Sequence, residues 1–391
     1  MAGAASLHLS LGSAAVEGCH SIALPELVQQ LNVCAVAAAT KQEAFTIREP
    51  GRALLRGAAS LGSLPLVQLL LTLLGDPSDI LSTNIDGATA LHAAAAAGHA
   101  AVVQCLLAAA PCSAAAVNHR GSTPLMAAAE NGRLEAAQVL LMADPAAARA
   151  ADSEGTTALH LGGNSPAMTE LLLQHMPDLA AKANRWGFTP LHSAVATDSP
   201  AAMQLLLAAA PQSLRHGANG GISTAHAAAN GGSLQALELL LQLAPDLAAA
   251  TDSEGFVPLH YASSKGHLAV VHRLLQLAPE TATATSARGR TALHIACRDG
   301  HLPVVEALLA QAPETAHGAA DGWLPQHEAC ANGHSAVVSR LLAAIPASVD
   351  ALTEDGDSAL HIAAGSGQAD RRLGISLPGP LSGKLMALFD T

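Results

Sequence analysis

Paired apolar residues recur along most of the chain at a helical spacing. Two Val residues precede two Leu residues in this way at Val102-Val103 with Leu106-Leu107, at Val270-Val271 with Leu274-Leu275, and at Val337-Val338 with Leu341-Leu342. The i, i+3, i+4 spacing places such side chains on one side of a helix. The pattern therefore predicts a series of short helices, each with one buried apolar stripe.

A second, shorter helix is predicted before each of these. It follows a Thr or Ser that can cap a helix N-terminus, at Thr89, Thr123, Thr157, Thr189, Ser223, Thr291 and Ser358. It ends at a glycine, which adopts the left-handed conformation of a helix end at little cost, at Gly98, Gly132, Gly232, Gly266, Gly300, Gly333 and Gly367. The chain thus predicts repeated helix-turn-helix units.

The units are spaced regularly. A glycine followed by a Thr-Pro-Leu-His-like tetrad recurs with a period of about 34 residues, at Gly87, Gly121, Gly155, Gly187, Gly221, Gly255, Gly289, Gly322 and Gly356. Such self-similarity predicts stacked units in which each repeat contacts only its neighbours. A single long domain is therefore compatible with a length of 391 residues.

This repeat resembles the ankyrin repeat over roughly residues 51–368, in units such as TPLHSAVATD at 189–198 and TALHIACRDGH at 291–301. The resemblance implies an all-α solenoid of helix-turn-helix units with short β-hairpin tips. We expect the repeat array at residues 43–368, after a non-repeat segment at 1–42 that forms a capping helix. A divergent tail follows at 369–391.

Several units depart from the pattern. A proline stops the second helix, and the extra residue of the 34-residue period is expected just after it, at Pro111, Pro145, Pro177, Pro211, Pro245, Pro279, Pro313 and Pro346. Gly162 and Gly163 should make the first helix of the third unit the weakest. Gln326 replaces a core leucine and should find a backbone partner, because an unpaired buried amide costs about 1–3 kcal/mol.

Composition and charge narrow the function classes. The net charge of -12 disfavours nucleic-acid binding, which depends on Lys and Arg at phosphates. The opening MAGAASLHLSLG lacks the features of a signal peptide. His92, His99 and Gln104 interrupt the longest apolar stretch, so no membrane span is expected. We expect a soluble monomer of the cytoplasm, with the nucleus as an alternative.

Six cysteines raise the question of disulfides. Cys297 and Cys330 occupy the same place in adjacent repeats, where packed helices lie about 8–10 Å apart, and a disulfide needs a Cα separation below about 7 Å. We therefore expect reduced thiols. The other four cysteines, Cys19, Cys34, Cys105 and Cys112, show no metal-ligand spacing.

Nineteen histidines suggest a metal-binding or catalytic role, but the repeat accounts for twelve of them. Eight lie in the tetrad and four after the helix-ending glycine. In the ankyrin family the tetrad histidine joins its own hairpin to the next by hydrogen bonds, so the resemblance implies neutral, structural histidines. Ala331 stands where an HExxH zinc motif starting at His327 needs its second histidine. We expect no catalytic residue, metal or cofactor.

The resemblance places partner contacts at the hairpin tips and on the exposed end of the first helix, along a concave face. The candidate protein-binding residues at these positions are Arg185, Trp186, Phe188, Phe256, Tyr261, Lys265, Arg290, Arg298, Trp323 and Glu328. The aromatic residues either anchor a partner or pack flat on neighbouring tips. The tip charges alternate in sign, which favours pairing along the stack over a charged partner surface.

Two functions fit these features. The first is a non-catalytic scaffold or adaptor that binds a partner protein on the concave face. The second is a targeting subunit of an enzyme complex such as a ubiquitin ligase, because Leu24-Pro-Glu-Leu27 is similar to the start of an F-box. Deleting residues 1–42 would distinguish the two, since only the second needs that segment to recruit an enzyme.

Overall fold

The computed structural model describes residues 41–346, 348 and 351–365. The predicted capping segment at 1–42 and the tail at 369–391 lie almost entirely outside this part of the chain, as do Cys19 and Cys34. The described residues form two compact units. The first runs to Arg185 and includes Ala208–Ala210, and the second comprises Trp186–Leu207 and the chain from Pro211 onward.

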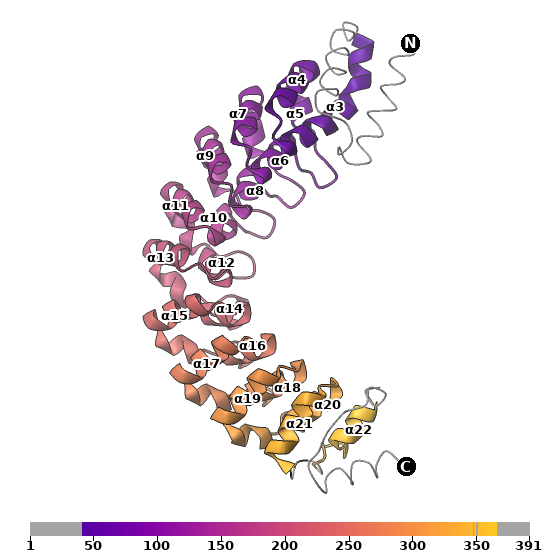
Figure 1. Cartoon of the computed structure of the whole chain (residues 1–391). Helices are drawn as coiled ribbons and strands as arrows, with labels where there is room; N and C mark the ends of the chain where they lie inside the picture. Colours follow the sequence, from indigo (N-terminus) through magenta and orange to yellow (C-terminus); the bar gives the residue numbers. More distant parts are fainter. Residues whose placement is uncertain (1–40, 347, 349–350, 366–391) are drawn as a thin grey trace. The chain divides into compact units, whose positions relative to one another are not determined.

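The first unit opens with a longer helix pair and continues with regular ones. The opening pair is α3 (Lys41–Leu61) and α4 (Leu64–Leu74), followed by the short α5 (Pro77–Ile80). First helices α6 (Ala90–Ala97), α8 (Pro124–Glu130) and α10 (Ala158–Leu161) form one layer (Figure 1). Second helices α7 (Ala100–Ala109), α9 (Leu134–Ala143) and α11 (Pro166–His175) form the other.

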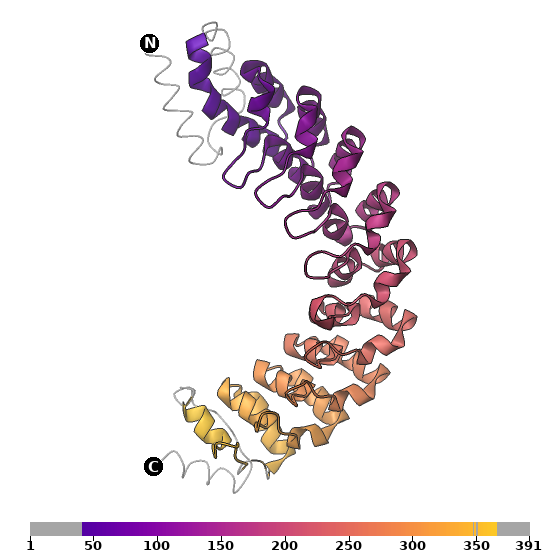
Figure 2. The ribbon, with the colours of Figure 1, turned by 180° about the vertical axis from the view of Figure 1, so that it is seen from behind.

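The second unit repeats this two-layer arrangement (Figure 2). Its first helices are α12 (Pro190–Ala196), α14 (Thr224–Gly231), α16 (Pro258–Lys265), α18 (Ala292–Asp299), α20 (Pro325–Ala331) and α22 (Ala359–Gly365). Its second helices are α13 (Pro200–Ala209), α15 (Leu234–Leu243), α17 (Leu268–Leu277), α19 (Leu302–Gln311) and α21 (Ser335–Ala344). The predicted all-α solenoid of helix pairs is confirmed.

The core is built from the residues that the apolar pattern selected. In α17 the buried side chains are Val270, Val271, Leu274 and Leu275, and α19 and α21 bury the same four positions. The first helices contribute buried leucine and alanine. The small alanine side chains let neighbouring helices approach closely. Each buried Leu contributes about 1.5–3 kcal/mol, so these stripes supply much of the contact between repeats.

The prolines after the second helices do more than stop them. Seven of the eight begin a five-residue 3₁₀ helix: η1 (Pro111–Ala115), η2 (Pro145–Arg149), η4 (Pro177–Ala181), η5 (Pro211–Arg215), η7 (Pro245–Ala249), η8 (Pro279–Thr283) and η9 (Pro313–His317). Proline suits this first position because its fixed φ is already helical. The hydroxyl of Thr281 donates to the carbonyl of Ala278 at 2.6 Å, which ties the turn to the end of the preceding helix.

The hairpin tips are tight turns with little β-structure. Within the described residues they carry only isolated bridges, at Ala151 with Thr157, Ala320 with Trp323, and Leu352 with Ser358. The eighth tip is the shortest, because a two-residue turn joins Ala320 and Trp323 through two mutual backbone hydrogen bonds. That turn places Asp321 at φ 50° and Gly322 at φ 75°.

The predicted backbone partner of Gln326 is confirmed, and the first helix of the third unit is short. Helix α10 is only four residues long and passes into the 3₁₀ helix η3 (Gly162–Asn164). Gln326 is buried, and its side-chain amide donates to the backbone carbonyl of Ser348. The ninth unit is described only through α22.

Candidate protein-binding surface

Five of the tetrad histidines join their own repeat to the next. His226 Nδ1 accepts from the backbone N–H of Ser223 at 3.1 Å, and its Nε2 donates to the carbonyl of Phe256 in the following tip at 2.9 Å. The same forward bond runs from His92 to Ser122, His260 to Arg290, His294 to Trp323, and His327 to Ala351. An N–H can only donate and a carbonyl only accept, so these rings are neutral with the proton on Nε2.

The pKa values of these five histidines agree with a neutral, structural role. Burial lowers the pKa of His92, His226, His260 and His327 below the ordinary value, against the opposing effect of the carbonyl hydrogen bonds. Burial lowers the pKa of His294 furthest, to about 4. These five histidines are therefore uncharged at neutral pH, as the sequence predicted.

The histidines after the helix-ending glycines bond in the opposite direction. His301 Nε2 donates to the carbonyl of Ser264, at the end of the preceding first helix, at 2.9 Å. Its ring lies over Gly266, where an added Cβ would come within 2.6 Å of Nδ1. Equivalent bonds run from His99 to Ser60, His267 to Asn230, and His334 to Arg298. Histidine pairs thus connect a repeat to both of its neighbours.

In the described part of the second unit, six residues lie immediately before the capping position of a first helix, and the last of them, Asp357 before α22, is exposed. The other five lie before α12, α14, α16, α18 and α20. We call Phe188, Ile222, Phe256, Arg290 and Trp323 the tip-end row. All five are half-buried. Four are large and apolar, whereas the same register in the first unit holds Ala88, Ser122 and Thr156. The sequence predicted four members of this row and missed Ile222, which the register alone could have revealed.

The aromatic rings of the row stand edge-on to histidines of their own repeats. Ring centroids lie 5.5 Å apart for Phe188 and His192, 5.3 Å for Phe256 and His260, and 6.3 Å for Trp323 and His327. These contacts differ from the flat packing on neighbouring tips that the sequence left open. Edge-to-face geometry is a favourable arrangement of aromatic pairs, so the three rings are held in fixed orientations.

Tyr261 lies beside the row on α16. Its hydroxyl donates to Asp252 Oδ2 at 2.8 Å, and its ring contacts those of His226 and Phe256 edge-on. Burial and the bond to Asp252 raise the pKa of the phenol well above its ordinary value. Tyr261 is therefore a neutral, half-buried ring whose position is fixed from three sides.

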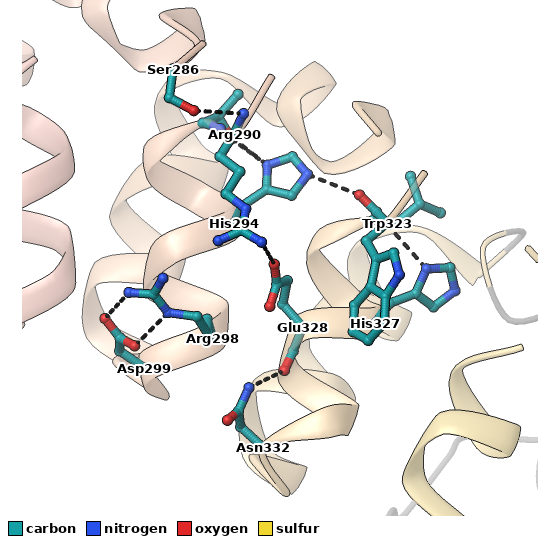
Figure 3. A network of polar contacts seen from close by, with 11 residues as sticks. Ser286, Arg290, His294, Arg298, Asp299, Trp323, His327, Glu328 and Asn332 are labelled. Carbon is teal, nitrogen blue, oxygen red and sulfur yellow. Dashed lines mark hydrogen bonds and ion pairs between the residues drawn. The ribbon is translucent and has the colours of Figure 1, made fainter. Parts of the chain in front are cut away.

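Charged side chains between α18 and α20 form a polar network (Figure 3). Arg290 Nη2 lies 3.5 Å from the carboxylate of Glu328, and Arg298 Nε donates to Asp299 Oδ1 at 2.9 Å. Asp299 also accepts from the hydroxyl of Ser264 at 2.8 Å. Burial raises the pKa of Glu328, although the charges of Arg290 and Arg298 oppose that shift. Glu328 is thus placed below the surface as the partner of Arg290.

The remaining predicted residues are more exposed. Lys265 ends α16 and is exposed, and Trp186, immediately before a tip glycine, is 43% exposed. Arg185 belongs to the first unit, where its guanidinium pairs with Glu154 of the preceding tip. That pair agrees with the predicted pairing of charges between neighbouring tips.

Acidic and amide residues three positions before the tip glycines have a role that sequence reasoning missed. Asp252 Oδ1 accepts from the backbone N–H groups of Glu254 and Phe256 at 2.9 and 2.8 Å. Asn84, Asn118 and Asp152 close their tips in the same way. Such turns explain the recurring Asn or Asp. The carboxylates of Asp152 and Asp252 are therefore used within the fold.

The four described cysteines are free thiols, and Cys297 and Cys330 are buried. Burial raises the pKa of Cys330 to about 12 and that of Cys297 still higher. Low thiolate content makes a buried cysteine unreactive. These two thiols are packing residues, in agreement with the expectation of reduced cysteines.

Comparison with known protein families gives two matches, both to models of repeats. The model described as "Ankyrin repeats (3 copies)" matches residues 55–149 and 273–350. The model described as "Ankyrin repeats (many copies)" matches residues 225–275. No curated protein matches the chain. In the part of the chain that the structure describes, no helix is long and apolar enough to cross a membrane.

Proposed function

The chain belongs to the ankyrin repeat family, and we propose that it is a non-catalytic scaffold or adaptor that binds a partner protein. The binding surface in this proposal is the face formed by the hairpin tips and first helices of the second unit. Ankyrin repeats typically mediate protein–protein interactions, which supports the general class. The fold alone does not select a partner, so the proposal depends on the residues of that face.

The distribution of aromatic side chains carries the proposal. The chain has seven aromatic residues, and Trp186, Phe188, Phe256, Tyr261 and Trp323 gather on tips and first helices of one unit. The alanine and leucine core is already filled without them. Half-buried aromatic residues supply much of the binding energy at protein interfaces, because they are large and lose little entropy on binding.

The free thiols support a proposal for the location of the protein. We place it in the cytoplasm or nucleus, because disulfides are rare there and the four described cysteines are free.

Alanine substitution on this face tests the proposal. The full chain with Tyr261→Ala or Trp323→Ala should capture its partner proteins at least about tenfold more weakly, the range of an interface anchor. Affinity capture with quantitative mass spectrometry measures the loss, and circular dichroism should show unchanged helicity.

A matched control is available on the other layer of the same unit. Leu277 is an exposed apolar residue at the end of α17, and Leu277→Ala should leave capture unchanged. Equal capture by the parent chain, the aromatic variants and Leu277→Ala would rule out this face as the binding surface.

A further inference from the structure

The tip-end row recurs at the spacing of the repeats. Phe188, Ile222, Phe256, Arg290 and Trp323 come from five successive repeats. The first helices that follow them pack directly on one another, α12 on α14, α14 on α16, α16 on α18 and α18 on α20. Packed helices lie about 8–10 Å apart. The row therefore presents one side chain about every 8–10 Å along the unit.

One backbone conformation has the same period. A polyproline II helix has three residues per turn and rises about 3.1 Å per residue, so every third side chain recurs at about 9 Å on one side. An α-helix repeats a side chain on one face about every 5.4 Å, and an extended β-strand does so about every 6.6 Å. The row thus matches a polyproline II segment better than either alternative.

The side chains of the row also suit such a segment. Polyproline II peptides are recognised by surfaces lined with aromatic residues. The rings of Phe256 and Trp323 are held by edge contacts with His260 and His327, so they need little ordering when a ligand binds. A polyproline II segment is itself stiff, and binding between two ordered partners loses less conformational entropy.

Arg290 is the single charged member of the row. Its side chain is 27% exposed, and it lies 3.5 Å from the carboxylate of Glu328. The exposed part of this side chain is available to a carboxylate from a ligand. Exposed Glu254 and Asp321 on the tips to either side would repel carboxylates elsewhere, so they would restrict an acidic residue to the position over Arg290.

We infer that the tip-end row binds a polyproline II segment of a partner protein, with apolar side chains at every third residue and one acidic residue in register with Arg290. In this arrangement successive apolar side chains contact Phe188, Ile222 and Phe256, the carboxylate contacts Arg290, and a further apolar side chain contacts Trp323. The inference rests on the proposed function and names the chemistry of its partner.

Synthetic peptides test the register directly. The first probe has leucine at every third position except the fourth such position, which is glutamate, with proline and serine between them. A second probe has the reversed sequence, because either chain direction fits the row. The comparison peptide has the same composition with its leucines at every fourth position. Fluorescence anisotropy with the full chain should show at least about tenfold tighter binding of a period-three probe.

The charge requirement is tested separately. Replacing the glutamate of the tighter probe by lysine should weaken binding about tenfold. The double variant Arg290→Gln with Glu328→Gln removes both charges and leaves neither buried alone, and it should lose this preference while still favouring the period of three. The control Leu277→Ala should behave as the parent chain, and circular dichroism verifies that each variant is folded.

Equal affinity for period-three and period-four peptides, or no measurable binding of either, would overturn the inference. A glutamate preference that persists in the double variant would also overturn the assignment of Arg290. If partner capture still depends on Tyr261 and Trp323 while the peptides fail, the proposed function stands and only the polyproline II ligand is wrong. If the peptides fail and partner capture also does not depend on Tyr261 and Trp323, the proposed function is wrong as well.

Discussion

Histidine is the residue whose chemistry is used most often in this molecule. In five of the tetrad histidines, one ring nitrogen accepts from the backbone of its own repeat, and the other donates to the next tip. Both bonds need the neutral imidazole, and burial keeps it neutral at physiological pH. A residue type that often binds metals or transfers protons serves here as a fixed connector.

Removing one connector should destabilise the array locally. His294 accepts from the backbone N–H of Thr291 at 3.2 Å and donates to the carbonyl of Trp323 at 3.2 Å. His294→Ala leaves both groups without these bonds, and we expect a loss of about 1–3 kcal/mol in the free energy of unfolding. Urea denaturation measures it. His272 is exposed on α17, so His272→Ala should change stability by less than about 0.5 kcal/mol.

The low pKa of His294 predicts how the free energy of unfolding depends on pH. Burial lowers the pKa of His294 to about 4, whereas an unfolded histidine titrates near 6.5. Below pH 6.5 the unfolded state therefore binds more protons, so the contribution of His294 is complete above pH 6.5 and declines as the pH falls toward 4. This contribution should diminish by about 2 kcal/mol between pH 6.5 and 5.

A variant isolates this contribution from other titrating groups. His294→Asn cannot bind the proton, so its stability should decline less steeply between pH 6.5 and 4 than that of the parent chain. Urea denaturation at several pH values provides the two curves. Parallel curves would contradict the assignment.

At the scale of elements, the glycines of the third unit interrupt the helix pattern in the sequence. For Gly162 the structure gives a packing reason. Gly162 follows the short helix α10, and it is buried. A Cβ at this position would lie 2.8 Å from Met168 Cγ and 3.2 Å from Leu172 Cδ1. Both side chains are completely buried, so they have little freedom to move. The missing side chain lets α11 approach α10.

Substitution by alanine should therefore have opposite effects at two helical glycines. Gly57 in α3 has no neighbouring atom within 4 Å of an added Cβ, and Gly57→Ala should stabilise by about 0.5–1 kcal/mol. Gly162→Ala should instead destabilise by about 1–3 kcal/mol, because it overpacks a closed site. Thermal denaturation of both variants distinguishes this explanation from helix propensity, which predicts a gain at each position.

Sequence patterns predicted the helix pairs well, because their apolar spacing and end signals are local. They predicted less of what depends on contacts between units. Asp252 was interpreted as one of the tip charges that alternate in sign, although it closes a turn and accepts from the Tyr261 hydroxyl. The prolines were interpreted as stops, although they begin 3₁₀ helices. Glu328 was predicted to be a contact residue, and only the fold shows that Arg290 covers it.

At the scale of the whole molecule, stability is the sum of repeat stabilities and neighbour contacts, so it can differ along the chain. The third repeat has a four-residue first helix, whereas α16 and α18 in the second unit have eight residues each. Fewer backbone hydrogen bonds in a short helix make local opening less costly.

Hydrogen exchange should report this difference. We expect amides in residues 158–175 to exchange faster than the helical amides of residues 221–346. Mass spectrometry of exchanged peptides provides the comparison at one pH and temperature. Equal protection of the two regions would contradict the predicted order of stability.

The direction of the histidine bonds has a consequence for how such a chain changes over evolutionary time. His260 bonds forward and His301 backward, and in both cases the acceptor is a main-chain carbonyl. Every repeat supplies that carbonyl whatever its side chains are. A copied or deleted repeat would therefore meet the acceptor it needs at each new junction. The number of units can change by recombination without a matching change in the neighbouring sequences, while the tips remain free to diverge.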